Sequence, residues 1–324
     1  MPGALRERER KRRSPLRLHP LTPTLFPIVH SPSLSLPLPP FIHRLTSVGG
    51  DRSIFHWDVA TGAIVRRWRG HDEGPPGASC VAMGGLAESL VLTGGPDTTA
   101  RAWDLRSRSD VAVAVLRGAK DSVTGVAVPG AGGPGPPALL TPPGGPLVSR
   151  PTGAPAAPAA PSPSASPHEI VTASVDGFLR RYDLRAGQLT ADGVGSPIAS
   201  LALTRADGGA AALVACLDGR LRLLDRGTGA VLASYTGHVA AGGVRTDCVI
   251  LAPDESTVAV GSEDGSVVGW DLASEAVVAR VATGCAPGGP VTSVATHPVD
   301  GRTMVTGSTD GVVRVFVRRD EGGV

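Results

Sequence analysis

The sequence predicts an all-β fold of the propeller type, built from six recognisable repeats. The first observation is a fixed spacing: an acidic turn residue is followed six positions later by a bulky residue, six times along the 324-residue chain. The pairs are Asp51/Trp57, Asp97/Trp103, Asp176/Tyr182, Asp218/Leu224, Asp264/Trp270 and Asp310/Phe316. Successive copies lie 46, 79, 42, 46 and 46 residues apart, and subtracting a low-complexity insert of about 38 residues from the long interval leaves about 41. One propeller blade takes roughly 40–45 residues, so each copy accounts for one blade.

The second observation is the order of strands and turns within each copy. A short β-rich segment runs into turn residues and a second β-rich segment follows, as in IVTASVDG before FLRRYDL and VAVGSEDG before SVVGWDL. An Asp-Gly turn between two such segments indicates a β-hairpin, because glycine accepts the positive φ that the turn requires. A further turn around glycine, as in GTGAVLASYTGH, adds an outer strand before a Gly-His dipeptide. The pattern therefore predicts four antiparallel strands per repeat.

Two segments fall outside this pattern and set the domain boundaries. Residues 1–45 begin with a basic run and continue with closely spaced prolines, which remove backbone donors, so we expect this segment to be mostly disordered. Residues 130–167 are rich in Pro, Ala, Gly and Ser and lack the large apolar side chains that offset ordering entropy, which predicts a disordered surface loop. The predicted propeller spans residues 46–318, and residues 319–324 form a tail.

Composition narrows the class of protein. A net charge of +2 gives no strong attraction to nucleic acid, and the excess positive charge is concentrated in the basic run near the N-terminus. That run is interpreted as a nuclear-import signal, as a solvated charged tail, or as leader sequence wrongly assigned to the gene. The four cysteines form no CxxC pair, which argues against a zinc site and for reduced thiols. Without a run of about 18 apolar residues or a secretory leader, the sequence predicts a soluble protein of the cytoplasm and nucleus, with no cofactor or metal.

The dipeptides of the repeats carry a resemblance. Gly70-His71, Gly237-His238, Trp57-Asp58, Trp103-Asp104 and Trp270-Asp271 resemble the GH and WD dipeptides of WD-repeat proteins. In that family a His, a Ser or Thr, the turn Asp and the Trp form a hydrogen-bonded network inside the blade. The resemblance implies one full set, His71, Thr93, Asp97 and Trp103, and partial sets formed by Thr172 with Asp176, His238 with Asp264 and Trp270, and Thr306 with Asp310. Leu224 and Phe316 stand in the tryptophan position, where they supply packing without the hydrogen bond.

A narrower resemblance covers residues of about 46–129 and 168–317. HEIVTASVDGFLRRYDLRAGQL and the repeats after it resemble the mitogen-activated protein kinase organizer family of WD-repeat scaffolds. The resemblance implies a seven-bladed propeller whose partners are proteins of kinase cascades and of pre-mRNA splicing complexes. We expect the propeller to be monomeric and non-catalytic.

The two ends of the repeat array depart from that family. The first repeat lacks an obvious innermost strand, and little sequence follows Phe316 for an outer one. Two explanations are open: a six-bladed ring that recruits residues near 20–45 for closure, or a 5′ part of the gene that has been wrongly assigned.

Three functions other than a scaffold are alternatives for this sequence. Catalysis is disfavoured because the histidines are scattered and the aspartates recur at one equivalent turn position per repeat, so we predict no catalytic residues. Arg106 in WDLR and Arg185 in YDLR resemble the Trp-Asp-x-Arg pattern of substrate receptors of cullin-type ubiquitin ligases, or are solvated arginines at strand ends. Direct RNA binding would need exposed stacking aromatics, and aromatic residues make up only 3% of the chain. A protein scaffold is therefore the predicted function, with a ligase receptor as the alternative.

Overall fold

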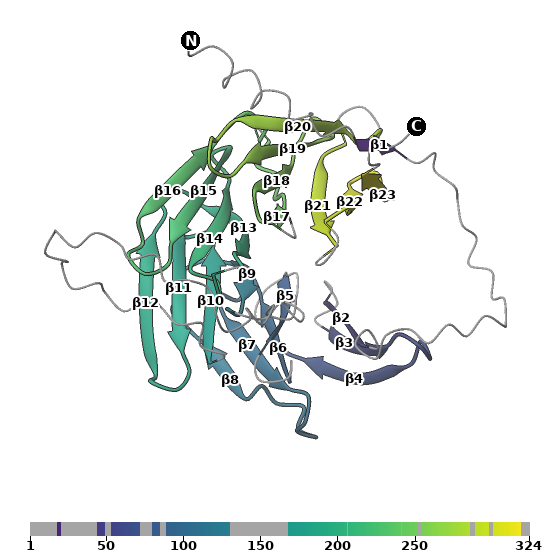
Figure 1. Ribbon diagram of the computed structural model, residues 1–324. Coiled ribbons are helices and arrows are strands. Elements are labelled where there is room, and N and C mark those ends of the chain that lie inside the picture. The colour runs from purple at the N-terminus through teal and green to yellow at the C-terminus, as the bar shows by residue number, and fades with distance from the viewer. Residues whose placement is uncertain are drawn as a thin grey trace, which may run out of the picture.

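The strands form six sheets arranged as the blades of a ring (Figure 1). The computed structural model describes residues 18–20, 44–48, 53–71, 80–84, 89–129, 168–205, 207–240, 242–251, 254–285, 289–297 and 301–318. Every secondary-structure element in these ranges is a β-strand. The all-β propeller predicted from the repeats is confirmed, with one blade for each repeat, and the described residues form no seventh blade.

The blades follow one another in chain order. The first contains β2 (Arg44–Val48), β3 (Ser53–Asp58) and β4 (Ile64–Arg69), and the second contains β5 (Cys80–Gly84), β6 (Leu90–Gly94), β7 (Ala100–Asp104) and β8 (Ala114–Leu116). The third contains β9 (Val123–Ala127), β10 (Glu169–Ser174), β11 (Phe178–Asp183) and β12 (Gln188–Gly193), and the fourth contains β13 (Ile198–Leu203), β14 (Ala211–Cys216), β15 (Arg220–Asp225) and β16 (Val231–Tyr235). The fifth contains β17 (Cys248–Leu251), β18 (Thr257–Gly261), β19 (Ser266–Asp271) and β20 (Val277–Ala282), and the sixth contains β21 (Val291–Thr296), β22 (Thr303–Ser308), β23 (Val313–Arg318) and β1 (Leu18–Pro20).

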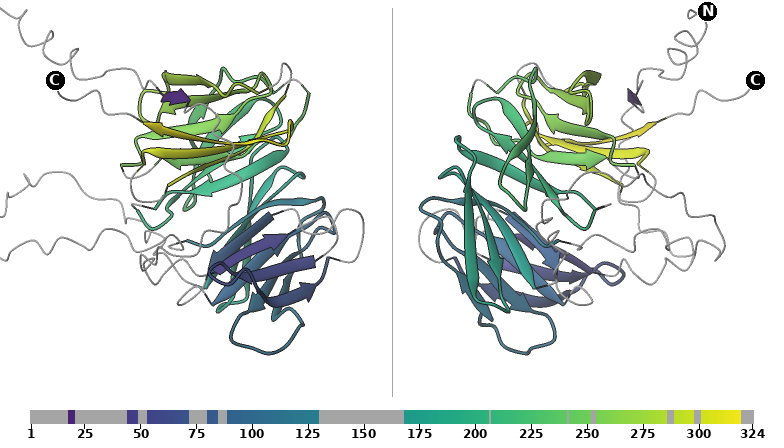
Figure 2. Two further views of the ribbon diagram at one scale, coloured as in Figure 1. Left: turned by 90° about the vertical axis from the view of Figure 1, so that its right-hand side faces the viewer. Right: turned by 60° about the vertical axis from the view of Figure 1, so that its left-hand side comes forward.

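Burial follows the radial order of the strands. In Figure 1 the first strand of a four-stranded blade lies near the centre and the last lies on the rim, and the side views show strands crossing from one face of the ring to the other (Figure 2). The second strand of the fourth blade, β14, is buried along its whole length, whereas the rim strand β12 of the third blade is exposed at nearly every residue. The middle strands therefore hold the core, because both of their faces pack against neighbouring blades.

Apolar side chains between successive blades form the core. Five clusters of buried residues exist among the described residues, and each joins one blade to the next. In the cluster between the first two blades, Ile54 and Trp68 pack against Val91 and Trp103. The cluster between the fifth and sixth blades joins Val267 to Met304 and Phe316 in the same way. The ring is thus stabilised by one repeated interface rather than by a single central core.

The two end blades differ from the other four. The first blade has three described strands, and its β2 precedes the repeat's turn as the second strand does elsewhere, so no strand of the described residues occupies its innermost position. The sixth blade takes its outer strand from the other end of the chain: β1 pairs antiparallel with β23, Leu18 opposite Arg318. β1 and the start of β2 lie within the segment predicted to be mostly disordered, and there the structure has strands. The rest of residues 1–45, the predicted loop 130–167 and the tail 319–324 lie outside the described residues.

Candidate functional site

The second blade holds a continuous chain of buried hydrogen bonds. Trp103 Nε1 donates to Thr93 Oγ1 at 3.0 Å, and Thr93 Oγ1 lies 2.9 Å from His71 Nε2. His71 Nδ1 in turn lies 2.8 Å from Asp97 Oδ1. Every donor in the chain is satisfied when the neutral imidazole carries its proton on Nδ1 and Thr93 donates to Nε2. The four residues thus form one continuous hydrogen-bonded chain within the blade, from Trp103 at one end to Asp97 at the other.

Glycine is required before the histidine of this blade. A Cβ atom added to Gly70 would lie 2.7 Å from the edge of the Trp103 ring, closer than real Cβ contacts. Gly70 therefore lets the chain pass over the tryptophan and deliver His71 to Thr93 and Asp97. This contact is the physical reason for the Gly-His dipeptide in this blade.

The turn aspartates organise their own hairpins. In the five blades where this residue is described, its carboxylate accepts the backbone N–H two residues later, at 3.0 to 3.2 Å. These aspartates are Asp97, Asp176, Asp218, Asp264 and Asp310. Asp51, the sixth, lies outside the described residues. An aspartate that fixes the turn in this way explains why the residue recurs once per repeat.

An arginine partner for the turn aspartate was not found from the sequence. Four residues after the aspartate, Arg101, Arg180, Arg222 and Arg314 form ion pairs with Asp97, Asp176, Asp218 and Asp310, with N to O distances of 2.5 to 3.1 Å. In the fifth blade Arg280, on the rim strand β20, lies 3.0 Å from Asp264 instead. The sequence contains this pair as an Asp-x-x-x-Arg spacing in four of the six repeats, and that spacing could have identified the arginines.

The remaining predicted network residues are only partly brought together. Trp57 donates to Ser47 at 2.8 Å, and Ser47, four residues before Asp51, was missed in the sequence although it corresponds to Thr93. Trp270 donates to the carbonyl of Thr236 at 2.9 Å, and His238 packs edge-on against that tryptophan at 5.8 Å between ring centroids.

The third and sixth blades use a different hydroxyl. Thr172 and Thr306 are buried, but Asp176 and Asp310 accept hydrogen bonds from serines two residues upstream, Ser174 and Ser308. Tyr182, in the tryptophan position, lies 3.5 Å from the carbonyl of Arg117. Leu224 and Phe316 are each 1% exposed and fill the same position by packing.

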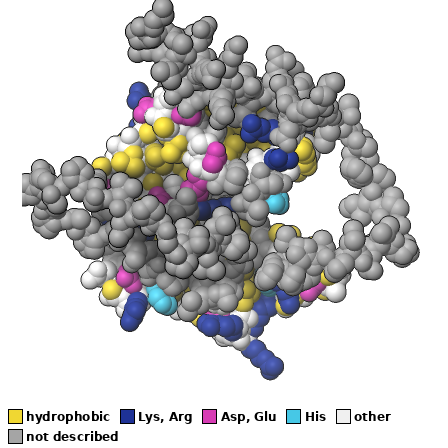
Figure 3. Space-filling view, in the orientation of Figure 1, with side chains coloured by type: hydrophobic (Ala, Val, Ile, Leu, Met, Phe, Trp, Pro, Cys, Tyr) yellow, Lys and Arg dark blue, Asp and Glu magenta, His cyan; other side chains and the backbone are white. Residues whose placement is uncertain are grey.

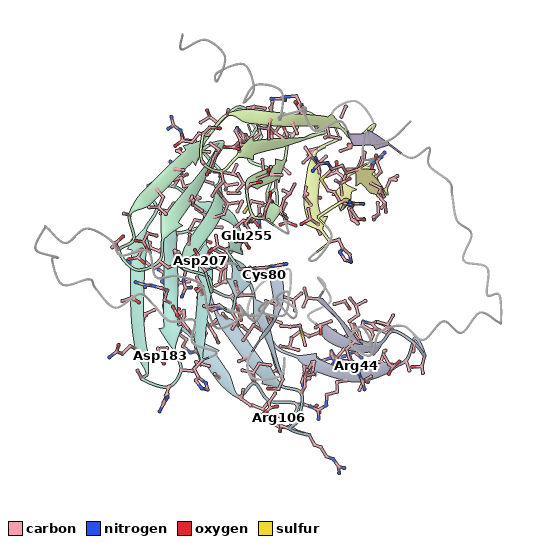
Figure 4. The ribbon with its side chains drawn as sticks, in the orientation of Figure 1. Arg44, Cys80, Arg106, Asp183, Asp207 and Glu255 are labelled. Carbon is pink, nitrogen blue, oxygen red and sulfur yellow. The ribbon has the colours of Figure 1, made fainter. Side chains whose placement is uncertain are left out.

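Arg106 and Arg185 lie in equivalent turns of the second and third blades, three residues after Trp103 and Tyr182. The Arg106 side chain is 72% exposed and is held against Asp104, with Nε 3.1 Å from Oδ1. Arg185 is also exposed, and its backbone N–H donates to Asp183 at 2.8 Å. Arg106 and Asp183 lie on the rim of the ring (Figure 4), and basic side chains gather on that rim over the first and second blades (Figure 3). This rim can present cations to a partner.

The centre of the ring contains a cavity of about 370 Å³. It is lined by residues of the inner strands, including Cys80, Ser200 and Cys248, and by Arg245 and Asp247, which come just before β17. Burial raises the pKa of the Cys248 thiol to about 12, so this thiol stays protonated and is a poor nucleophile. Among the described residues no group of three or more His, Cys, Asp and Glu side chains could hold a metal ion. No helix in the described ranges is long and apolar enough to span a membrane.

Acidification is expected to weaken the blades through the turn aspartates. Burial alone raises the pKa of Asp176, but hydrogen bonds from Arg180, Lys120 and Ser174 outweigh it and lower the pKa to about 2. Because this value lies below the ordinary one of 3.8, the group stabilises the fold above about pH 4, and the stabilisation is lost as the pH falls towards 2. The free energy of unfolding falls by up to about 2 kcal/mol as a result.

Urea unfolding at pH 7, 4 and 3 measures this fall, and Asp176→Asn should flatten the dependence of the unfolding free energy on pH. The exposed Asp110→Asn is the control, and an unaltered profile in Asp176→Asn would exclude this assignment.

Comparison with known proteins agrees with the repeats and the fold. The family model for the WD domain, G-beta repeat, matches residues 229–271 and 280–316. WD repeat domain-containing protein 83 of Rattus norvegicus is 43% identical over 135 residues, which cover 42% of this chain and 41% of the rat protein. The Dictyostelium discoideum homolog of that protein is 26% identical over 266 residues, covering 82% of this chain and 76% of its own length.

A solved structure shows the same fold. The WD40 β-propeller domain of Doa1 superposes with a TM-score of 0.61 at 18% identity, over 86% of this chain and 76% of that one. At this identity the similarity is one of fold alone. The stretches that match the WD domain, G-beta repeat, lie in the fourth to sixth blades of the propeller.

Proposed function

We propose that this protein is a non-catalytic scaffold on which other proteins assemble. The observation that carries the proposal is that the reactive side chains already have partners within the fold: His71 Nδ1 lies 2.8 Å from Asp97 Oδ1, Trp103 donates to Thr93, and the Cys248 thiol is held protonated. What the ring offers to other molecules is rigid surface. A rigid ring that binds two partners raises their effective concentration without chemistry of its own.

The partners are proposed from resemblance. The resemblance of the repeats to kinase-organizer scaffolds supports a role in pre-mRNA splicing complexes, in kinase cascades or in both, and the relatives described above are likewise WD-repeat proteins. Such a role requires a protein of the nucleus and cytoplasm that binds proteins rather than RNA directly. Affinity purification of the tagged chain from its own cells, with and without RNase, followed by mass spectrometry, tests it. Splicing factors that persist after RNase support the splicing role, kinases alone support the signalling role, and no protein above background contradicts the scaffold.

A substrate receptor of a cullin-type ubiquitin ligase is the second candidate. The observation that favours it is the exposed pair of arginines in equivalent turns, one of them fixed by Asp104. If this function holds, we expect Arg106→Ala combined with Arg185→Ala to abolish recovery of a cullin adaptor. The alanines remove the two guanidinium groups that would contact acidic groups of the adaptor. Arg108→Ala, an exposed arginine in the same turn, is the matched control. The receptor function would be excluded if the parent protein recovers no adaptor, or if the parent and all variants recover the same amount.

A further inference from the structure

The turn between β7 and β8 of the second blade is longer than its equivalents in the other blades. It spans residues 105–113, whereas the equivalent turns of the first, third, fourth and fifth blades comprise residues 59–63, 184–187, 226–230 and 272–276. The turn lies on the rim of the ring, where Arg106 marks it in Figure 4. Because strands β7 and β8 could be joined by a shorter connection, the added residues are available for a function other than joining strands.

Arginine and serine alternate in this turn, in the order Arg106, Ser107, Arg108 and Ser109. Ser109 and both arginines are exposed, whereas Ser107 is half-buried. Ser109 has arginines one and three residues before it. Ser107 has an arginine one residue before it but Asp104, an acidic residue, three residues before it. Of the two hydroxyls, that of Ser109 is therefore the more accessible and has two cations on the same side of the chain.

The hydrogen bonds of the turn are local and lie at the surface. Ser109 Oγ accepts the N–H of Val111 at 3.1 Å, and the Ser109 N–H donates to Ser107 Oγ at the same distance. Water can replace such exposed bonds, so local opening of the turn costs little free energy. Residues 106–110, once extended, reach about 16 Å, which allows Ser109 to enter the cleft of another enzyme while the blade stays folded.

An equivalent turn provides an internal comparison. Ser274, in the turn of the fifth blade, is also exposed, but its hydroxyl donates to Asp271 Oδ1 at 2.8 Å and Glu275 follows it in the sequence. Residues 272–276 contain no arginine or lysine. Protein kinases distinguish their substrates by the pattern of charges around the hydroxyl. An enzyme that binds cations before the hydroxyl would accept Ser109 and reject Ser274.

We propose that Ser109 is phosphorylated by a serine kinase whose acidic substrate cleft selects the arginines one and three residues before the hydroxyl. In the transfer, Ser109 Oγ forms a bond to the γ-phosphorus of ATP, and the bond from that phosphorus to the bridging oxygen breaks to release ADP. The serine proton passes to the catalytic aspartate of the kinase. The modification goes beyond the scaffold function and occurs whether or not the ring assembles partners.

The phosphate reverses the charge of the turn. Residues 105–113 contain two arginines and one aspartate, which give a net charge of +1, and a phosphoserine adds about −1.5 to −2. The Arg106 guanidinium is already turned towards an anion, with Nε and Nη2 each 3.1 Å from an oxygen of Asp104. Phosphate oxygens accept such paired hydrogen bonds from arginine, so phosphoserine 109 competes with Asp104 for this side chain. A rim that presents cations then presents an anion.

Peptide mapping of the protein purified from its own cells, with phosphatase inhibitors present throughout, tests the site. Trypsin cleaves after Arg108 and Arg117, so residues 109–117 form one peptide in which Ser109 has the only hydroxyl. We expect mass spectrometry to find phosphate on this peptide at a higher occupancy than on Ser274. Occupancy at Ser109 that is no higher than at Ser274 would overturn the proposal.

Arginine variants test how the kinase recognises the turn. The folded parent and variant chains are incubated with an extract of the same cells and γ-labelled ATP, and the initial rate of labelling of residues 109–117 is measured. Arg106→Ala is expected to lower this rate about tenfold or more, because it removes one charged contact with the kinase. Arg185→Ala, the exposed arginine at the equivalent position of the third blade, is the matched control and should label at the parent rate. Equal rates for the parent and Arg106→Ala, or no label on this peptide in the folded parent, would contradict the proposal.

Discussion

Trp103→Ala is expected to lower the free energy of unfolding by about 3 to 5 kcal/mol, the largest effect of any single substitution in the second blade. The side chain is 1% exposed and packs with Ile54, Trp68 and Val91 at the interface between the first two blades. Alanine would leave a cavity there, and the buried Thr93 hydroxyl would lose the hydrogen bond that the Trp103 N–H donates to it. Urea unfolding followed by circular dichroism measures the change.

Trp103→Phe separates the two contributions. Phenylalanine keeps most of the ring but removes the N–H, so we expect a loss of about 1 kcal/mol from the hydrogen bond together with a smaller packing loss. An alanine variant that unfolds at the same urea concentration as the parent would show that this interface does not stabilise the ring.

Arg226→Met is expected to cost about 3 kcal/mol, because it breaks a buried ion pair between two blades. Arg226 is 1% exposed, and its Nη2 lies 2.6 Å from Glu169 Oε1 at the start of β10. The same guanidinium donates to the carbonyl of Gly209. Methionine fills a similar volume but leaves the Glu169 carboxylate with no cation in a largely buried site. Thermal unfolding of the variant measures the loss.

The double variant Arg226→Met with Glu169→Leu is the control for that substitution. If the cost of the single change comes from the stranded carboxylate, removing the carboxylate as well should restore most of the stability, since an apolar pair tolerates burial. Equal destabilisation by the single and the double variant would instead assign the loss to packing of the long side chain.

Features with a repeated sequence signal were the ones that could be predicted. The Asp51 and Trp57 spacing and its five later copies predict the blades because one short motif fixes one turn and one buried position. The same repetition would have identified the arginines four residues after the aspartates, had the spacing been compared across repeats. Ser47 was missed because serine is common in turns and only its alignment with Thr93 reveals its role.

Features that depend on contact between distant segments could not be predicted. Arg226 reads as a turn residue after Asp225, and nothing nearby in the sequence announces Glu169, which comes from the preceding blade. β1 is three residues long and includes Pro20, so neither periodicity nor propensity indicates a strand. Val313 and Leu45 are 69% and 56% exposed although the sequence pattern predicts a buried apolar residue at both repeat positions, because burial there depends on which blades are neighbours.

The pairing of β1 with β23 sets an order of events in biosynthesis. Almost 300 residues separate the two strands, and at about 5 to 20 residues per second a ribosome needs roughly 15 to 60 s to make that stretch. Joining the two ends of an otherwise unfolded chain of that length costs about 5 kcal/mol in loop entropy, and this cost falls once the intervening blades have brought the ends together. β1, which precedes every other described strand in the chain, is therefore built into the ring only after β23 has been made, and until the two pair the outer edge of β23 is open to a chaperone.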